Sequence, residues 1–199
     1  MEYQLVLATN NAHKLQEVRE ILEPHGIKVF GLNDLNLHPE DVEENADTYY
    51  GNALIKATSV AKITKLPVIA DDSGLEIDAM DNQPGLHSAR FAQENGGHPK
   101  AIEKILSLLK DNRKARFVCD IVLMNEEERP ILFEGIVEGE IAKQPYGQGG
   151  FGYDPIFICK ETNKTYAEMG EDEKNKLSHR GTALHKLIKY LLDKKKISR

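Results

Sequence analysis

The sequence has no long apolar run and little cysteine. None of its apolar stretches approaches the roughly 20 residues that a membrane-spanning helix needs. Two cysteines, Cys119 and Cys159, are too few for a disulfide framework, and both lie in apolar stretches, so we expect core residues. The first residues lack the basic and apolar regions of a secretory signal. These absences predict a cytoplasmic protein with no membrane partner.

An excess of positive charge is also missing. The 199 residues carry a formal net charge of −6. Binding to nucleic acid depends on lysines and arginines that neutralise backbone phosphates, so we expect no nucleic-acid partner. A small phosphorylated substrate is not excluded, because a nucleoside triphosphate travels with Mg²⁺ and needs only a few local cations. No linker or internal repeat is visible, so we expect a single domain over residues 1–199.

Strand-like and helix-like segments alternate irregularly along the chain. We expect strands or strand pairs at residues 4–8, 27–30, 66–70, 75–79, 116–124, 131–141 and 156–158. We expect helices after a cap at Asn10 or Asn11, at about 48–64, from Pro99 onward, and at about 172–194. Residues 84–99 read mostly as loop. This order is not a regular βαβ array, so it predicts a mixed α/β fold.

A polar run links the first strand to the first helix. It consists of Thr9, Asn10, Asn11, Ala12, His13 and Lys14. Unpaired N–H groups and the positive end of the helix dipole make such a place suitable for an anion. Lys14 falls in the first helical turn, where the dipole favours an acid, so a bound anion would explain it. A simple helix cap with an exposed lysine explains the same residues.

A double aspartate follows a predicted buried strand, within Ala-Asp-Asp-Ser-Gly at residues 70–74. Adjacent carboxylates repel each other, and their desolvation is costly unless a cation is present. Mg²⁺ binds one or two carboxylates together with substrate phosphates. Since neighbours on a strand point to opposite sides, we expect either Asp71 or Asp72 to face a metal while the other holds a turn. A capped turn without any metal is the alternative.

A glycine-rich run at residues 147–152 matches the dinucleotide fingerprint only in its letters. Pro155 follows it where that fingerprint needs a helix, and the motifs of a kinase are missing, so we reject both assignments. The glycines let a planar ligand approach closely, with Phe151 and Tyr153 available to stack on it. His179 and Arg180 are expected together on the last helix, where Arg180 suits a keto oxygen or a phosphate. A surface basic patch is the alternative there.

Six collinear motifs together resemble the inosine triphosphate pyrophosphatase family, also called the XTP/dITP diphosphatases. They lie within residues 7–14, 52–57, 70–75, 84–90, 149–157 and 178–184. The resemblance implies an ITPase-like α/β fold, with a mixed twisted sheet flanked by helices in an elongated, two-lobed single domain, and a homodimer. It implies hydrolysis of dITP, ITP and XTP to the nucleoside monophosphate and pyrophosphate, which clears these non-standard purine nucleotides from the pool.

The resemblance also implies residue roles. Asp72 would be the catalytic proton acceptor, and Glu43 and Asp72 would be the Mg²⁺ ligands. Ser73 would contact the substrate, and residues 9–14 would bind its phosphates. The base and ribose side would comprise Phe151, Gly152, Tyr153, Asp154, Lys174, His179 and Arg180. Gly51 stands where the family often has Glu, and the acidic stretch 40–44 otherwise reads as a solvated loop.

Two other functions are compatible with parts of the sequence. A Maf-like nucleotide pyrophosphatase would have a different base preference, and Ser-His-Arg-Gly at residues 178–181 weighs against it. A non-catalytic nucleotide sensor would not need the two aspartates beside Lys14. For the pyrophosphohydrolase, hydrogen-bond donors of the protein would donate to the 6-keto oxygen of hypoxanthine or xanthine and would leave the 6-amino group of adenine unpaired.

Overall fold

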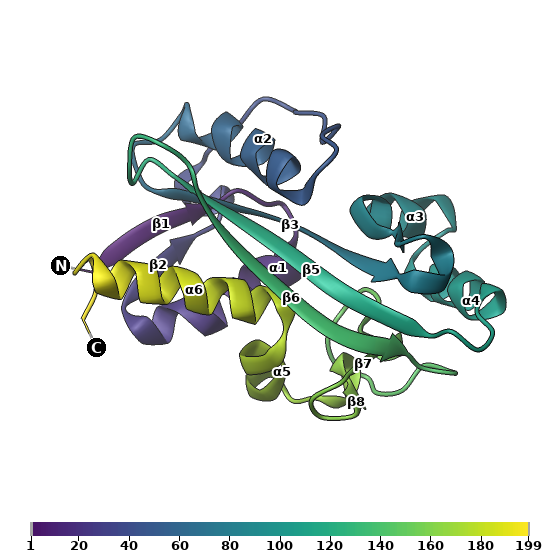
Figure 1. Ribbon diagram of the computed structural model, residues 1–199. Helices are drawn as coiled ribbons and strands as arrows, with labels where there is room; N and C mark the ends of the chain where they lie inside the picture. The colour runs from purple at the N-terminus through teal and green to yellow at the C-terminus, as the bar shows by residue number, and fades with distance from the viewer. Residues whose placement is uncertain (1, 199) are drawn as a thin grey trace. The chain divides into compact units, whose positions relative to one another are not determined.

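The computed structural model describes residues 2–198, within which eight strands form one sheet in the order β2-β1-β3-β5-β6-β7-β8, with β4 paired to β3 (Figure 1). The strands are β1 (Tyr3–Leu7), β2 (Ile27–Phe30), β3 (Val68–Ile77), β4 (Gln83–Pro84), β5 (Lys114–Met124), β6 (Ile131–Ile141), β7 (Phe157–Cys159) and β8 (Lys164–Thr165). The helices are α1 (Ala12–Leu22), α2 (Tyr49–Ala61), α3 (Ser88–Glu94), α4 (His98–Leu108), α5 (Glu171–Leu177) and α6 (His179–Asp193).

The sheet is mixed in direction. Strand β1 runs parallel to both β2 and β3, whereas β4 is antiparallel to β3 and β7 is antiparallel to β6 and β8. The prediction of a mixed α/β sheet with flanking helices is therefore confirmed. In the described part of the chain, no helix has both the length and the apolar character needed to cross a membrane.

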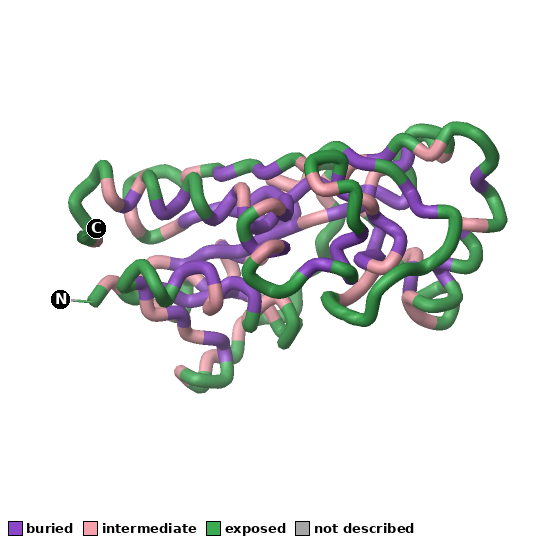
Figure 2. Tube along the Cα trace, turned by 90° about the horizontal axis from the view of Figure 1, so that it is seen from below, coloured by how far each residue is buried: buried purple, intermediate pink, exposed green. Residues whose placement is uncertain are grey.

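The chain divides into two compact units. Unit 1 comprises the described residues up to 72, residues 119–134 and those from 180 onward, and unit 2 comprises residues 73–118 and 135–179. The boundaries fall inside β3, β5 and β6, so these three strands contribute residues to both units. Figure 2 shows buried stretches along the interior of the trace and exposed stretches mostly at its outer turns.

The core of unit 1 lies on both faces of its strands. Side chains alternate along β1, so Leu5 and Leu7 belong to a cluster with apolar residues of α1 and α6. Val6 and Ala8 belong to a separate cluster with the small residues of α2. Because helices cover both faces, every residue on the buried strands of this unit faces either the α1 and α6 side or the α2 side.

The core of unit 2 is richer in aromatic rings. Phe117 packs edge-on against Phe157, with ring centroids 4.7 Å apart, and lies nearly parallel to Tyr166 at 5.6 Å. Apolar residues of α3 and α4 complete this cluster. Offset and edge-to-face contacts of this kind are the favoured arrangements of aromatic pairs.

The sequence predicted a turn at the double aspartate, and this prediction is wrong. The segments predicted as two strands, 66–70 and 75–79, form the single strand β3, which continues through the aspartates. The alternative of a capped turn is also wrong, because β3 runs through both aspartates without a turn. The residues predicted as a strand pair at 131–141 likewise form the one strand β6.

Two helix predictions also need correction. Residues 84–99, expected to be mostly loop, contain α3, whose first residue Ser88 lies after a turn of 3-10 helix. The helix expected over 172–194 is broken at Ser178, which has an extended ψ of 161° between α5 and α6. Apolar periodicity runs through this break unchanged, so periodicity alone did not reveal it.

Candidate active site

The predicted phosphate-binding run is a tightly capped helix start. Asn11 caps α1, and its Oδ1 accepts bonds from the N–H groups of His13 at 3.0 Å and Lys14 at 3.1 Å. The N–H of Asn11 donates to Thr9 Oγ1 at 3.1 Å. The first turn carries no acid. Asn10 and the following residues to His13 are exposed, so the loop presents polar atoms to solvent.

The side chain of Lys14 turns inward. Its Nζ lies 3.2 Å from Asp71 Oδ2 and 3.3 Å from Oδ1, and its side chain is only 17% exposed. The alternative of an exposed lysine is therefore wrong. Asp71 Oδ2 also accepts from Arg180 Nη2 at 3.1 Å and Nε at 3.3 Å, and Arg180 Nη1 donates to Glu17 Oε2 at 2.7 Å. Four charged residues thus form one cluster on the α1 and α6 side of unit 1.

Asp71 is held in its ionised form. Burial alone would raise the pKa of this carboxyl, but the positive charges of Lys14, Arg180 and Lys56 outweigh burial and hold the pKa well below its usual range. Arg180 forms ion pairs with the carboxylates of Glu17 and Asp71, and its side chain is 2% exposed. Asp71, for which the sequence suggested no role beyond a turn, is the shared counter-charge of two cations.

Asp72 lies on the other face of the strand. Its Oδ2 accepts from Asn52 Nδ2 of α2 at 3.2 Å. Burial raises the pKa of Asp72 to about 6; Lys56 acts in the opposite direction, and the neighbouring Asp71 raises the pKa further. The prediction that the two aspartates point to opposite sides is confirmed. Unlike the charge of Asp71, the negative charge of ionised Asp72 is not fully balanced by positive side chains among residues 2–198.

Asp120 is an acidic residue of this face to which the sequence analysis gave no role. It is buried on β5, and burial, followed by the charge of Glu134 and that of Asp72, raises its pKa to about 7. An aspartate inside the apolar run Phe-Val-Cys-Asp-Ile-Val at residues 117–122 was the available signal. Asn52 and Lys56 were part of a matched motif but also had no assigned role.

The two residues predicted to hold a metal, Glu43 and Asp72, lie in different surroundings. Among residues 2–198, no three His, Cys, Asp or Glu side chains form a group that could hold a metal ion. Glu43 is exposed in the segment before α2, whereas its neighbour Glu44 pairs with Lys56 at 2.9 Å. Asp72 nevertheless fits Mg²⁺, because a buried carboxyl with a raised pKa gains from a cation, and Mg²⁺ needs only one or two carboxylates.

The close packing around residue 51 explains why a glycine stands there. A Cβ at this position would lie 2.6 Å from the Cβ of Ala46 and 3.0 Å from Oγ1 of Thr48. Thr48 is the N-cap of α2 and accepts a hydrogen bond from the N–H of Gly51. A glutamate here would require Ala46 to move.

The glycine-rich loop belongs to unit 2 and is fixed by Asp154. Oδ2 of Asp154 accepts from the N–H of Phe151 at 3.0 Å and from Lys174 Nζ at 2.6 Å. Gly150 has a φ of +66°, and a Cβ there would collide with the same carboxylate. Lys174 Nζ also lies 4.7 Å from the ring centroid of Phe151. Three predicted substrate residues, Phe151, Asp154 and Lys174, therefore lie together, with Gly152 next in the chain.

Tyr153 and His179 occupy the interior of unit 2. Tyr153 is buried and donates its hydroxyl hydrogen to the backbone oxygen of Ser88 at 2.6 Å. The prediction that its ring is available to stack on a ligand is therefore wrong. His179 stacks on Phe117, with centroids 4.4 Å apart and planes within 7°. Ser73 begins the unit's part of β3 and is half-buried.

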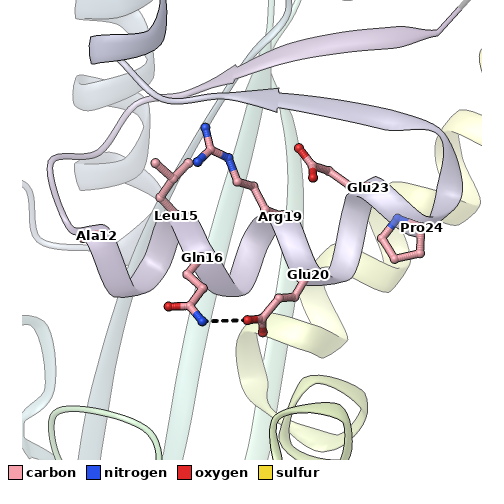
Figure 3. A pocket seen from close by; sticks show the side chains of 7 residues that line it. All are labelled: Ala12, Leu15, Gln16, Arg19, Glu20, Glu23 and Pro24. Atoms are coloured by element: carbon pink, nitrogen blue, oxygen red, sulfur yellow. Dashed lines mark hydrogen bonds between the residues drawn. The ribbon is translucent and has the colours of Figure 1, made fainter.

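A hollow in unit 1 lies along α1 (Figure 3). It is lined by Ala12, Leu15, Gln16, Arg19, Glu20, Glu23 and Pro24. Of the predicted site residues, only Ala12 contributes to it. Gln16 and Glu20 bond to each other across its rim at 2.9 Å, and the hollow carries no cluster of groups suited to catalysis.

Comparison with known proteins places this chain among relatives of nearly equal length. A sequence model of the Ham1 family matches residues 5–190. A dITP/XTP pyrophosphatase of Bacillus subtilis (strain 168) is 48% identical over 190 residues, which cover 94% of this chain and 96% of that protein. The solved structure of a HAM1 protein from Coxiella burnetii has a TM-score of 0.84 and 41% identity, covering 96% of this chain and 99% of that one. These findings confirm the resemblance inferred from the motifs: the chain belongs to the Ham1 family.

Proposed function

We propose that this protein hydrolyses non-standard purine nucleoside triphosphates, namely dITP, ITP and XTP, to the monophosphate and pyrophosphate. The names of the relatives support this substrate class. The observation that carries the proposal is the electrostatic difference between two neighbouring residues of β3. Asp71 is neutralised by two cations, and Asp72 is not. A buried, under-compensated carboxylate next to lysines is the arrangement that phosphate hydrolysis with a divalent cation needs.

The triphosphate is bound in this proposal by residues of unit 1. Lys14 holds phosphate oxygens while Asp71 orients its ammonium group, and the polar residues from Thr9 to His13 supply further contacts. Lys56 adds positive charge, because Asp71, Glu44 and Asp72 together outweigh the effect of burial and raise its pKa. Lys56 therefore stays protonated at neutral pH and can offset the phosphate charge.

Asp72 acts on the attacking water. In its ionised form it accepts a hydrogen bond or a proton from that water, and Asn52 holds one of its oxygens in place. We assign Asp72, with Glu43 as the second predicted ligand, to Mg²⁺. When bound, the ion supplies positive charge that stabilises the charge developing on the phosphate oxygens.

Recognition of the base is assigned to unit 2, with Arg180 as a further predicted contact. Phe151 offers the half-buried ring of the glycine-rich loop for stacking, supported by Lys174 and Asp154. Donors that include His179 would pair with a 6-keto oxygen and leave the 6-amino group of adenine without a partner. Ser73 remains a proposed substrate contact.

We further propose that the whole chain of 199 residues acts as one domain in the cytoplasm and assembles as a homodimer. The near-equal length of the relatives supports the single domain. The proposed homodimer rests on the family resemblance, and the proposed compartment rests on the sequence features described above.

The proposal is tested by measuring pyrophosphate release from dITP, XTP, dATP, dGTP and dTTP, each with and without Mg²⁺. We expect dITP and XTP to be cleaved at least ~100-fold more efficiently than dATP, because a site that donates to a 6-keto oxygen leaves the 6-amino group of adenine unpaired. Guanine carries the same 6-keto group, so dGTP measures discrimination that this readout does not supply. Preference for one of the standard nucleotides would favour the Maf-like alternative, which has a different base preference. Binding of dITP without any pyrophosphate release would favour the sensor.

A further inference from the structure

We propose that Glu17 is a positioning residue for Lys14, acting through Arg180 and Asp71. This inference rests on the proposed function, since it assigns Lys14 to the triphosphate. Glu17 carries none of the predicted roles and lies on α1, three residues after Lys14, so both side chains leave the helix on neighbouring parts of one face.

The four residues form a continuous chain of charge within unit 1. Glu17 Oε2 accepts from Arg180 Nη1 at 2.7 Å, and the other edge of the guanidinium donates to Asp71 Oδ2 at 3.1 and 3.3 Å. Lys14 Nζ closes the chain at 3.2 Å from the same Asp71 oxygen. Two cations and two carboxylates therefore balance, with alternating signs from one end to the other.

Glu17 matters because Arg180 and Lys14 compete for one carboxylate. The guanidinium is buried, so its charge must be balanced by nearby acids. With Glu17 ionised, Arg180 is shared between two carboxylates, and Asp71 can hold Lys14 as well. Without that charge, Arg180 draws more strongly on Asp71, and the ammonium group of Lys14 is held less firmly at its phosphate-binding position.

The test is Glu17→Gln, which keeps the size and an accepting oxygen but removes the charge. We expect kcat/KM for dITP to fall about tenfold. The matched control is Glu20→Gln, on the same helix and bonded to the Gln16 amide, for which we expect less than a twofold change. Far-ultraviolet circular dichroism checks that each variant folds. If Glu17→Gln does not fold, Glu17→Asp, which withdraws the carboxylate from Nη1, replaces it.

A double-mutant cycle with Lys14→Met distinguishes positioning from general structural support. If Glu17 acts through Lys14, its substitution should have little further effect once Lys14 is absent. Additive losses in the double variant would overturn the proposal. Calorimetric titration with inorganic pyrophosphate runs the same cycle without turnover: non-additive weakening supports positioning, and additive weakening opposes it. An inactive wild-type enzyme that still gives the non-additive binding pattern would refute the proposed function but not the role of Glu17.

Discussion

The two faces of β3 in unit 1 carry adjacent aspartates in opposite electrostatic conditions. On the α1 and α6 side, Asp71 meets Lys14 and Arg180, and its pKa lies well below the usual range. On the α2 side, Asp72 accepts from the neutral Asn52, and burial raises its pKa to about 6. Both carboxylates are buried, so the difference comes from the charges that each face supplies.

This difference teaches how one strand can provide both support and chemistry. A carboxylate whose charge is matched inside the protein stabilises the fold and has little affinity left for an added cation. A buried carboxylate whose charge is not matched destabilises the ionised protein and gains from a cation or a proton. Perturbed pKa values of the second kind are typical of functional sites.

The largest expected effect comes from Asp72→Asn. Removal of the carboxylate that orients water should lower kcat for dITP by about 10²- to 10⁴-fold, the usual contribution of a positioned acid–base group. Stability should change little or rise at pH 7, because the raised pKa means that ionised Asp72 opposes folding above about pH 6. Steady-state kinetics and urea unfolding measure the two quantities. Near-normal turnover would remove Asp72 from the mechanism.

Asp71→Asn should lower the free energy of unfolding, in contrast to Asp72→Asn. The substitution leaves buried cations short of a counter-charge, so we expect a loss of about 3–5 kcal/mol in the free energy of unfolding at pH 7. The pKa of Asp71 is lowered by folding, so its stabilisation is present above the ordinary value of 3.8 and is lost as pH falls through the native pKa. The difference between wild type and variant should therefore shrink below pH 4 in urea titrations. A difference independent of pH would contradict this account.

The sequence predicted the fold class and the alternating faces of the two aspartates. It did not predict their partners, because Lys14 and Arg180 are 166 positions apart and only the packing of α1 and α6 brings both to Asp71. The prediction of a turn at the aspartates was wrong for the same reason. Paired carboxylates with no visible counter-charge are expected to leave a buried strand, and here the counter-charge comes from distant helices.

The family resemblance assigned Phe151 and Tyr153 to the same side of the substrate, but the structure places their rings differently. Tyr153 and Phe151 are two positions apart and both aromatic, yet one is buried with its hydroxyl bonded and the other is half-exposed on the loop. Sequence patterns identify a motif but not the direction of each ring. Asp120 stands out in the sequence only as an acid within an apolar run, and its importance depends on the neighbouring Glu134 and Asp72, which the sequence does not place beside it.

The smallest expected effect concerns Asp120, which extends the acidic character of the α2 side. Its pKa is about 7, so raising the pH from 6 to 8 adds a negative charge close to Asp72. We expect the Mg²⁺ concentration that gives half-maximal activity to fall by about two- to fivefold over this range, in keeping with a screened charge interaction. Asp120→Asn should remove the part of that pH dependence that comes from Asp120, while the part that comes from ionisation of Asp72, whose pKa is raised to about 6, should remain. Mg²⁺ titrations of dITP hydrolysis at each pH measure it.

Asp120→Asn also separates the two faces, because the charged cluster on the α1 and α6 side should not respond to it. We expect the pH dependence of stability that Asp71 contributes below pH 4 to be unchanged in this variant. Asp41→Asn, in the exposed acidic segment, is the control for a general effect of negative charge on the metal. If both substitutions flatten the Mg²⁺ dependence equally, the effect belongs to the overall charge of the protein. If only Asp120→Asn does so, the acidic site on the α2 side includes Asp120 as well as Asp72.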